Sequence, residues 1–475
     1  MKTDLSNRLS SSGTAILRAA VLLALAGGLL AVGLLTAKLD PELVLLAVAA
    51  PVLLVLMLNR PAWGVLGIVL AAATVRFTLP TGTESRIVMS LVLTAAMLGV
   101  WLARAAALHR LETQPSRVHA PLLAFIAVCF ISYVWSIAFR DPTLSIWSSW
   151  PFVQLGALGV MVLLPAALLL ASNWFTDVRL IAALTAIIMG VGVLALIGYY
   201  TDLPTDFLQV SPLFPTWFCC LGLALALFNR RMPLALRGLL LVAVSTWIYF
   251  MFVAQFTWVS AWLPSMLAVG LVSLVRSRKL AAVLLALALL FGVYHQTFVN
   301  ASFSQERTES LDTRLAAYQQ NWQVTSRHLI FGTGPAGYAV YYMSYFPDNA
   351  MATHNNYVDL VSQTGIVGTV AFLAFLLALG RTARDLLRLT KGRDDFVRAF
   401  AVGSAGGLLA MVAAMGLGDW VLPFVYTQTI SGFDYAVYSW ICLGAMVAMQ
   451  RIVAAQAAAG TPETPEAAAT EGAAG

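Results

Sequence analysis

Apolar stretches long enough to cross a membrane recur along almost the whole chain, and this pattern constrains the fold more than any other feature. A helix needs about 20 mostly apolar residues to span the hydrocarbon core. Of the 475 residues, 60% are hydrophobic and 11% are charged, whereas soluble domains carry roughly 25% charged residues. The sequence therefore predicts an all-α, polytopic bundle of about 12–14 transmembrane helices. The candidate spans are residues 14–37, 42–58, 62–79, 87–105, 119–139, 152–172, 178–200, 213–228, 234–253, 256–275, 279–297, 355–379, 398–418 and 434–450.

The distribution of Lys and Arg between these spans indicates how the chain is oriented. If the N-terminus is cytoplasmic, the 28 Lys and Arg residues favour the cytoplasmic loops by about three to one, as the positive-inside rule expects. We therefore expect a multi-pass protein of the lipid bilayer with both termini in the cytoplasm. The net charge of +6 comes from these loops, and no nucleic-acid partner is expected.

One segment on the expected outer side, residues 298–354, is far longer than most other outer loops. Long loops are usually either functional or disordered, and the many aromatic residues of this one argue against disorder. Residues 310–324 are predicted to form a helix, because Leu315, Tyr318 and Trp322 recur on one face at helical spacing. We expect this loop to form a lid over the outer membrane surface.

The domain organisation follows from these features. Residues 1–297 are predicted to form an N-terminal transmembrane bundle of about 11 helices, and residues 298–354 the extracytoplasmic loop. Residues 355–453 form the C-terminal transmembrane helices. The tail, 454–475, consists largely of Ala, Gly, Pro, Thr and Glu, a composition that indicates disorder.

The stretch 351–372 places a histidine, two asparagines and an aspartate at the outer mouth of a predicted span. His354 suits a general base, because an imidazole with an ordinary pKa near 6.5 can accept a proton at neutral pH. Asp359 lies one turn deeper, where it could orient the imidazole or hydrogen-bond to a neighbouring helix. The alternative is that His354 is only an interfacial residue beside a helix cap, with Asn355 as the N-cap.

Several arginines lie on the expected outer side, where basic residues are disfavoured. Arg76, Arg86 and Arg140 lie at the outer ends of predicted spans, and Arg314 lies on the predicted loop helix. Arginine binds phosphate through two parallel hydrogen bonds, so this set would suit a lipid-borne pyrophosphate. Each arginine could instead snorkel to the interface or pair locally, as Arg140 could with Asp141.

Four motifs follow one another here: Arg314, Trp322, "FGTGPAGY" at 331–338 and "HNNYVDLVSQTGIVG" at 354–368. Their order resembles the O-antigen ligase and polymerase family of bacterial membrane glycosyltransferases. The resemblance implies transfer of a glycan from an undecaprenyl-pyrophosphate donor to a glycan or lipid-glycan acceptor, outside the bacterial inner membrane. The matching positions are Gly332, Gly334, Tyr338, His354, Asn355, Tyr357, Thr364, Gly365 and Gly368.

The resemblance also implies roles for individual residues. His354 would deprotonate the acceptor hydroxyl, and Arg314 would stabilise the leaving pyrophosphate, so that one displacement inverts the anomeric centre. No cofactor and no metal ion is expected, because the pyrophosphate donor is already activated. The remaining candidates for binding the substrate or its pyrophosphate are Arg76, Arg86, Arg140, Asn355, Tyr338 and Tyr357.

Two positions depart from the family pattern. Gln363 stands where the family usually has an acidic residue before Thr-Gly. Many members also carry Ser-Arg-Gly at the start of a span before the long loop, whereas this chain has "TWVSAWLP" at 257–264. If that arginine contacts phosphate in relatives, Arg76 or Arg140 would have to replace it here.

A transporter or flippase is the main alternative to a glycosyltransferase. It would predict ionisable residues near the middle of several spans, or inverted repeats with broken helices, and the sequence shows almost no mid-span charge and no clear repeat. A structural scaffold would leave His354 and the aromatic loop unexplained. The sequence therefore favours a glycosyltransferase, and it leaves open whether the enzyme is a ligase or a polymerase.

Overall fold

The computed structural model describes residues 57, 59–81, 85–110, 113–210, 213–254, 259–296, 300, 312–347 and 352–459. The chain divides into two units, residues 1–64 and 65–475. The described part of the first unit is residue 57 with residues 59–64, which include the start of the first helix named below. The predicted spans 14–37 and 42–58 lie almost entirely outside the described residues.

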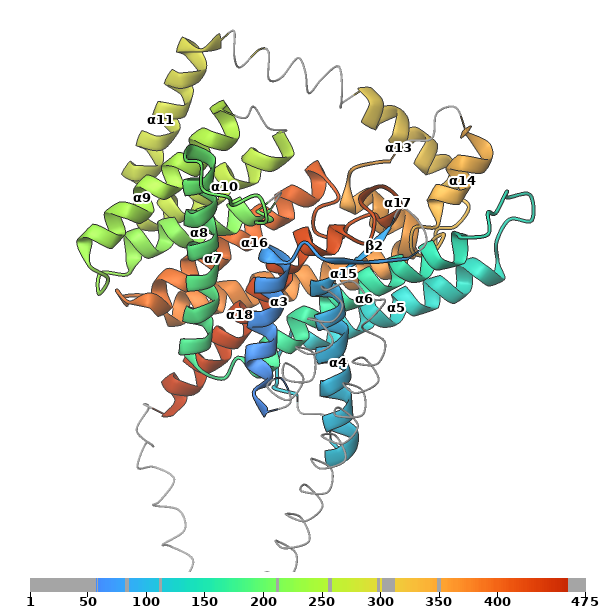
Figure 1. Ribbon diagram of the computed structural model, residues 1–475, viewed down its shortest axis with the longest axis horizontal. Helices are drawn as coiled ribbons and strands as arrows, with labels where there is room; N and C mark the ends of the chain where they lie inside the picture. The colour runs from blue at the N-terminus through green and yellow to red at the C-terminus, as the bar shows by residue number, and fades with distance from the viewer. Residues whose placement is uncertain are drawn as a thin grey trace, which may run out of the picture. The chain divides into compact units, whose positions relative to one another are not determined.

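Helices make up nearly all of the described regular structure (Figure 1). The exceptions are two short antiparallel strands, in which Thr78 pairs with Val88. In chain order the elements are α3 (Pro61–Thr74), β1 (Thr78–Pro80), β2 (Arg86–Val88), α4 (Met89–Leu108), α5 (His119–Ala138), α6 (Trp150–Trp174), α7 (Val178–Tyr200), α8 (Phe214–Phe228), α9 (Leu234–Tyr249), the π-helical turn η2 (Phe250–Ala254), α10 (Val259–Arg276), α11 (Arg278–Tyr294), α13 (Asp312–Thr325), α14 (Tyr338–Tyr345), α15 (Asn356–Leu389), α16 (Phe396–Leu417), α17 (Val425–Gln428) and α18 (Gly432–Ala459).

The predicted fold class, an all-α polytopic bundle, is confirmed. Within the described residues, nine helices are long and apolar enough to cross a membrane, and α3 and α8 are shorter apolar helices. The chain is therefore a multi-pass membrane protein. Its orientation, with both termini in the cytoplasm, stays a prediction.

Some helix ends differ from the predicted spans. The third span was expected to reach residue 79, but α3 ends at Thr74 and the chain continues into β1. At the other end of the chain, α18 continues to Ala459, so the first residues of the predicted disordered tail are helical. Alanine favours a helix even where hydropathy has dropped.

Small residues let the central helices pack closely. Helix α16 lies against α8 and α10, and α18 lies against α6. At Gly407 of α16, an added Cβ atom would come within 2.4 Å of the Trp217 ring of α8. The indole Nε1 of Trp217 in turn donates to Ser439 of α18 at 2.9 Å. Such close approaches at small residues are typical of helix contacts in membranes.

The glycine-rich turn between α13 and α14 forms hydrogen bonds with α15 where the helix is interrupted at Gly365. Gly365, inside α15, has φ 67° and ψ −168°, a backbone conformation that only glycine adopts readily. The amide of Thr333 donates to the carbonyl of Ser362 at 2.8 Å, and the amide of Ile366 donates to the carbonyl of Leu329 at 2.7 Å. The loop thus supplies hydrogen bonds that the interrupted helix cannot make for itself.

Gln363 completes this junction with its side chain. Its Oε1 accepts from the amide of Ala336 at 2.7 Å, and the residue is 5% exposed. An acidic side chain would offer the same acceptor oxygen, so the departure from the family pattern at this position preserves the contact. At Gly332, an added Cβ would come within 2.5 Å of the Gln363 backbone, which explains why the turn needs glycine.

Candidate active site

The first turn of α15 fixes the backbone that carries His354. Asn355 is the N-cap, and its side chain accepts from the amides of Tyr357 at 3.0 Å and Val358 at 3.4 Å, as Asn commonly does at this position. His354 lies just before the helix with φ 47°. Its ring therefore projects from the loop and does not share a helical face with the residues that follow.

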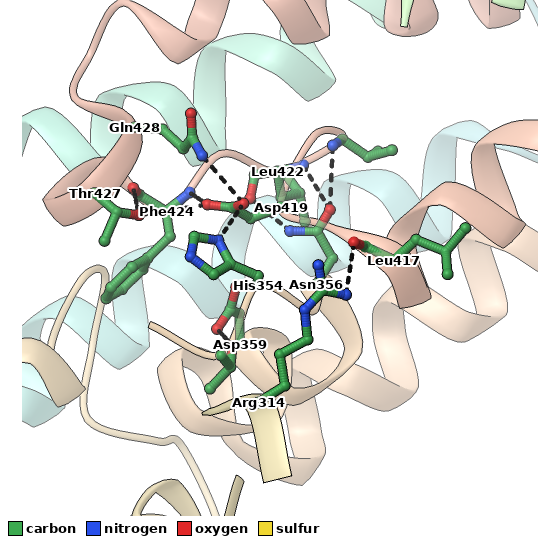
Figure 2. Close-up of polar contacts among 12 residues, drawn as sticks. Arg314, His354, Asn356, Asp359, Leu417, Asp419, Leu422, Phe424, Thr427 and Gln428 are labelled. Atoms are coloured by element: carbon green, nitrogen blue, oxygen red, sulfur yellow. Dashed lines mark hydrogen bonds and ion pairs between the residues drawn. The ribbon is translucent and has the colours of Figure 1, made fainter. Parts of the chain in front are cut away.

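Asp419 is the partner of His354. It follows the end of α16, its side chain is 1% exposed, and its Oδ1 lies 3.3 Å from Nδ1 of the half-exposed imidazole (Figure 2). The hydrogen bond that Nδ1 of His354 donates to Asp419 raises the pKa of His354 above its usual 6.5, and partial burial opposes this rise. Because Nδ1 is engaged by a carboxylate, Nε2 is the nitrogen that can exchange a proton with a substrate.

The carboxylate of Asp419 is itself held by the short segment that leads into α17. Gln428 Nε2 donates to Oδ1 at 3.2 Å, and the amide of Phe424 donates to Oδ2 at 3.4 Å. Thr427 adds a longer contact at 3.5 Å. These donors fix the carboxylate in place.

Asn356 holds the same segment against α15. Its Oδ1 accepts from the amides of Val421 at 3.1 Å and Leu422 at 3.2 Å, and its Nδ2 donates to the Leu422 carbonyl at 2.7 Å. The side chain is almost completely buried. Asn356 therefore sets where Asp419 stands relative to His354.

Arg314 approaches the pair from α13. Its Nη1 donates to the carbonyl of Leu417 at 3.0 Å, one of the terminal carbonyls of α16 that have no partner within the helix. Its positive charge acts on the imidazole of His354 and opposes protonation there. Figure 2 shows the guanidinium on the side of Asn356 and Leu417, with His354 nearby. The structure thus brings together the two residues predicted to be catalytic.

Asp359 does not orient the imidazole through a hydrogen bond. It is 2% exposed and accepts from Tyr338 Oη at 2.6 Å and from the hydroxyl of Thr353. Tyr338 is fully buried and stacks on Phe424, with ring centroids 4.2 Å apart. Of the two roles that the sequence left open for Asp359, the contacts match the second, which joins neighbouring helices.

The other predicted binding residues near His354 contact protein groups. Asn355 Nδ2 donates to Tyr318 Oη at 3.1 Å, and Tyr357 Oη donates to the carbonyl of Val412 at 2.8 Å. Both residues are partly exposed. Trp322, which shared the predicted apolar face of α13, is 60% exposed, whereas Asn321 is buried in the contact with α15.

The three arginines predicted from the N-terminal half are held elsewhere. Arg76 lies after α3 and donates to three backbone carbonyls, those of residues 206–208, at 2.5–3.0 Å. Arg140 donates to Gln154 Oε1 at 3.0 Å, and Arg86 is exposed on β2. The main electrostatic influences on His354 come instead from Asp419 and Arg314.

Sequence reasoning missed Asp419 and Asn356. Asp419 is 65 positions from His354, and local periodicity carries no information about such a pair. One signal was present, since "GLGDW" at 416–420 places an acidic residue at the outer end of the span 398–418. Asn356 is the second asparagine after His354, and only the packing of the α16–α17 segment shows what it binds.

The fold and the site define a polytopic membrane protein in which a histidine–carboxylate pair lies under the electrostatic influence of an arginine. Residues 216–373 match the family model described as O-Antigen ligase. This match covers about a third of the chain and confirms the resemblance drawn from the motifs. It supports a membrane protein of the O-antigen ligase type.

The matched region begins near the start of α8 and ends within α15. It includes Arg314 and His354, whereas Asp419 lies beyond its end. A search among curated proteins found no match.

Proposed function

We propose that this protein transfers or polymerises a glycan from an undecaprenyl-pyrophosphate donor onto an acceptor hydroxyl, at the outer face of the inner membrane. One observation carries the proposal. The half-exposed imidazole of His354 is bound through Nδ1 to the buried carboxylate of Asp419, and the charge of Arg314 acts on the same ring. A base held by a carboxylate beside a cation is the arrangement that this displacement requires.

In the proposed reaction, Nε2 of His354 removes the proton from the acceptor hydroxyl as its oxygen attacks the anomeric carbon. The bond from that carbon to the pyrophosphate oxygen breaks, and undecaprenyl pyrophosphate leaves with the electron pair. Asp419 stabilises the imidazolium that forms, and Arg314 stabilises the charge that develops on the leaving oxygen. The imidazolium then loses its proton to water. A single displacement inverts the anomeric centre.

The other predicted contacts differ in how readily they could reach a ligand. Arg86 is exposed, and we retain it as a pyrophosphate contact. Arg76 and Arg140 would first have to break their present bonds to protein oxygens. Asn355 and Tyr357 would contact the acceptor beside His354, while Tyr338 would act through Asp359 and Phe424.

The test is the loss of transfer in His354→Ala. The purified variant should insert normally and transfer no glycan from a lipid-pyrophosphate donor, because it lacks the proposed base. His295→Ala is the matched control, since His295 is exposed at the end of α11 and should retain full activity. Near wild-type turnover by His354→Ala would refute the base assignment.

The transporter alternative makes a different prediction for the same assay. A transporter would move the lipid-linked glycan without breaking its bond to pyrophosphate. Release of undecaprenyl pyrophosphate by the purified protein therefore supports the transferase, and translocation without release would support the transporter.

A further inference from the structure

A cavity of about 540 Å³ lies between α15 and α16, along parts of both helices that the catalytic proposal does not use. One wall comes from the C-terminal half of α15 and the residues that follow it, and the other comes from α16. The residues that line it are Leu376, Gly380, Ala383, Arg384, Leu387, Arg388, Lys391, Arg398, Ala405, Leu408, Leu409 and Val412.

Most of the cavity is apolar and elongated. Arg398 and Val412, which line opposite ends of its α16 wall, are 14 positions apart, about 21 Å at a rise of 1.5 Å per residue. One leaflet of a bilayer contributes about 15 Å of hydrocarbon, half of the roughly 30 Å core. The groove is therefore long enough to receive an acyl chain across a whole leaflet.

One end of the cavity is strongly basic. Arg384 and Arg388 lie one turn apart on the side of α15 that faces the cavity, Lys391 lies in the turn after the helix, and all three side chains are exposed. The carboxylate among them, Asp385, pairs instead with Arg117 at 2.9 Å. The cavity thus joins an apolar groove to a cluster of positive charge.

Arg398 has a different role from these three residues. Its Nη1 donates to the carbonyl of Leu387 at 2.7 Å and to Thr390 Oγ1 at 3.2 Å, and its guanidinium lies 5.7 Å from the centre of the Phe228 ring. It therefore fixes the start of α16 against the end of α15.

We propose that this cavity binds an anionic phospholipid. The phosphate would lie among Arg384, Arg388 and Lys391, and one acyl chain would run along the groove between α15 and α16. Basic pockets between transmembrane helices on the cytoplasmic side are suited to acidic lipid headgroups, and the distribution of Lys and Arg predicts that this end of α15 is cytoplasmic. The proposal is independent of glycan transfer.

The first test removes the charge. The full-length protein would be purified in detergent and titrated with phosphatidylglycerol or with phosphatidylcholine of the same chain length, and bound lipid would be counted by native mass spectrometry. The triple variant R384Q/R388Q/K391Q should lose affinity for phosphatidylglycerol on the order of a hundredfold, since each basic residue contributes about 1 kcal/mol near an acidic lipid.

The matched control for charge is R276Q/R278Q/K279Q. These three residues are exposed at the junction of α10 and α11, are expected on the same side of the membrane, and do not line the cavity. The control loses the same three charges, so it should keep the wild-type affinity. Equal losses in both variants would show a general effect of net charge and would overturn the proposal.

The second test fills the groove without touching the charges. Gly380 lines the cavity, and an added Cβ at this position meets no atom within 4 Å. Gly380→Leu should therefore fold normally and lose bound phosphatidylglycerol. Gly190→Leu in α7, where an added Cβ also meets no atom within 4 Å, should retain it.

Three further results would overturn the proposal. The wild type could bind phosphatidylcholine as tightly as phosphatidylglycerol, which would make the basic cluster irrelevant. The charge variant could keep its affinity, which would mean that Arg384, Arg388 and Lys391 form only a solvated face. Gly380→Leu could retain the lipid, which would place the acyl chain outside the groove.

Discussion

Replacing Asp419 with Asn tests whether this carboxylate acts on the imidazole of His354. The substitution keeps the shape of the side chain and removes its charge. A hydrogen bond to a charged group contributes about 1.5–3 kcal/mol. The His354 side chain is 45% exposed, so water screens the interaction and the lower end of that range applies. We therefore expect kcat/KM for glycan transfer to fall about tenfold at neutral pH.

The pH dependence separates this role from a structural one. The hydrogen bond from His354 to Asp419 raises the pKa of His354. A general base works only in its neutral form, so wild-type activity should fall as the pH drops through that raised pKa. Without the carboxylate the pKa of His354 decreases. The acidic limb of the pH profile should therefore move to lower pH in Asp419→Asn.

The assay is kcat/KM against pH for transfer from a lipid-pyrophosphate donor, with folding checked by thermal unfolding. Asp177→Asn is the control, because Asp177 is the N-cap of α7 and Asn caps a helix about as well. This control should match the wild type. An equal loss at every pH, with the acidic limb unmoved, would refute the proposed action of Asp419 on His354.

Three further predictions concern neighbouring residues. Arg314→Lys should transfer glycan nearly as poorly as Arg314→Ala, because lysine cannot form two parallel hydrogen bonds to phosphate. Steady-state kinetics measure this, and full activity of the lysine variant would mean that positive charge alone suffices. Gly365→Ala should lower the thermal unfolding midpoint, because φ at this position is 67° and the new Cβ would lie 2.2 Å from the carbonyl oxygen of Ile330. An unchanged midpoint would contradict this prediction. Asn356→Ala should lower the free energy of unfolding by about 1–3 kcal/mol and reduce activity, because buried backbone groups lose their partner. Asn355→Ala should lower the free energy of unfolding by only about 1 kcal/mol, because it removes a helix cap. Chemical unfolding measures the stability of both variants. Equal losses of stability would contradict the proposal that Asn356 holds the α16–α17 segment against α15.

Contacts between helices that are far apart in the sequence explain which features of the site could not be predicted from the sequence. The glycine-rich motif at 331–338 is visible in the sequence, but its hydrogen bonds to the break at Gly365 depend on how α15 packs. Arg76 was expected to point toward the site. It instead donates to carbonyls more than 100 positions away, because those backbone groups are close in space and need donors.

The sequence by itself determined the class of the protein and pointed to the two residues that we propose to be catalytic. Hydropathy is a local property, since a span must be apolar along its own length, so the helices could be read directly from composition. The motif order then singled out His354 and Arg314. Only the tertiary structure decided that Asp419 holds the imidazole and that Asn356 positions Asp419. Those contacts arise where the ends of α15 and α16 meet, and the pairing of buried polar groups across two helices depends on packing that no single stretch of sequence encodes.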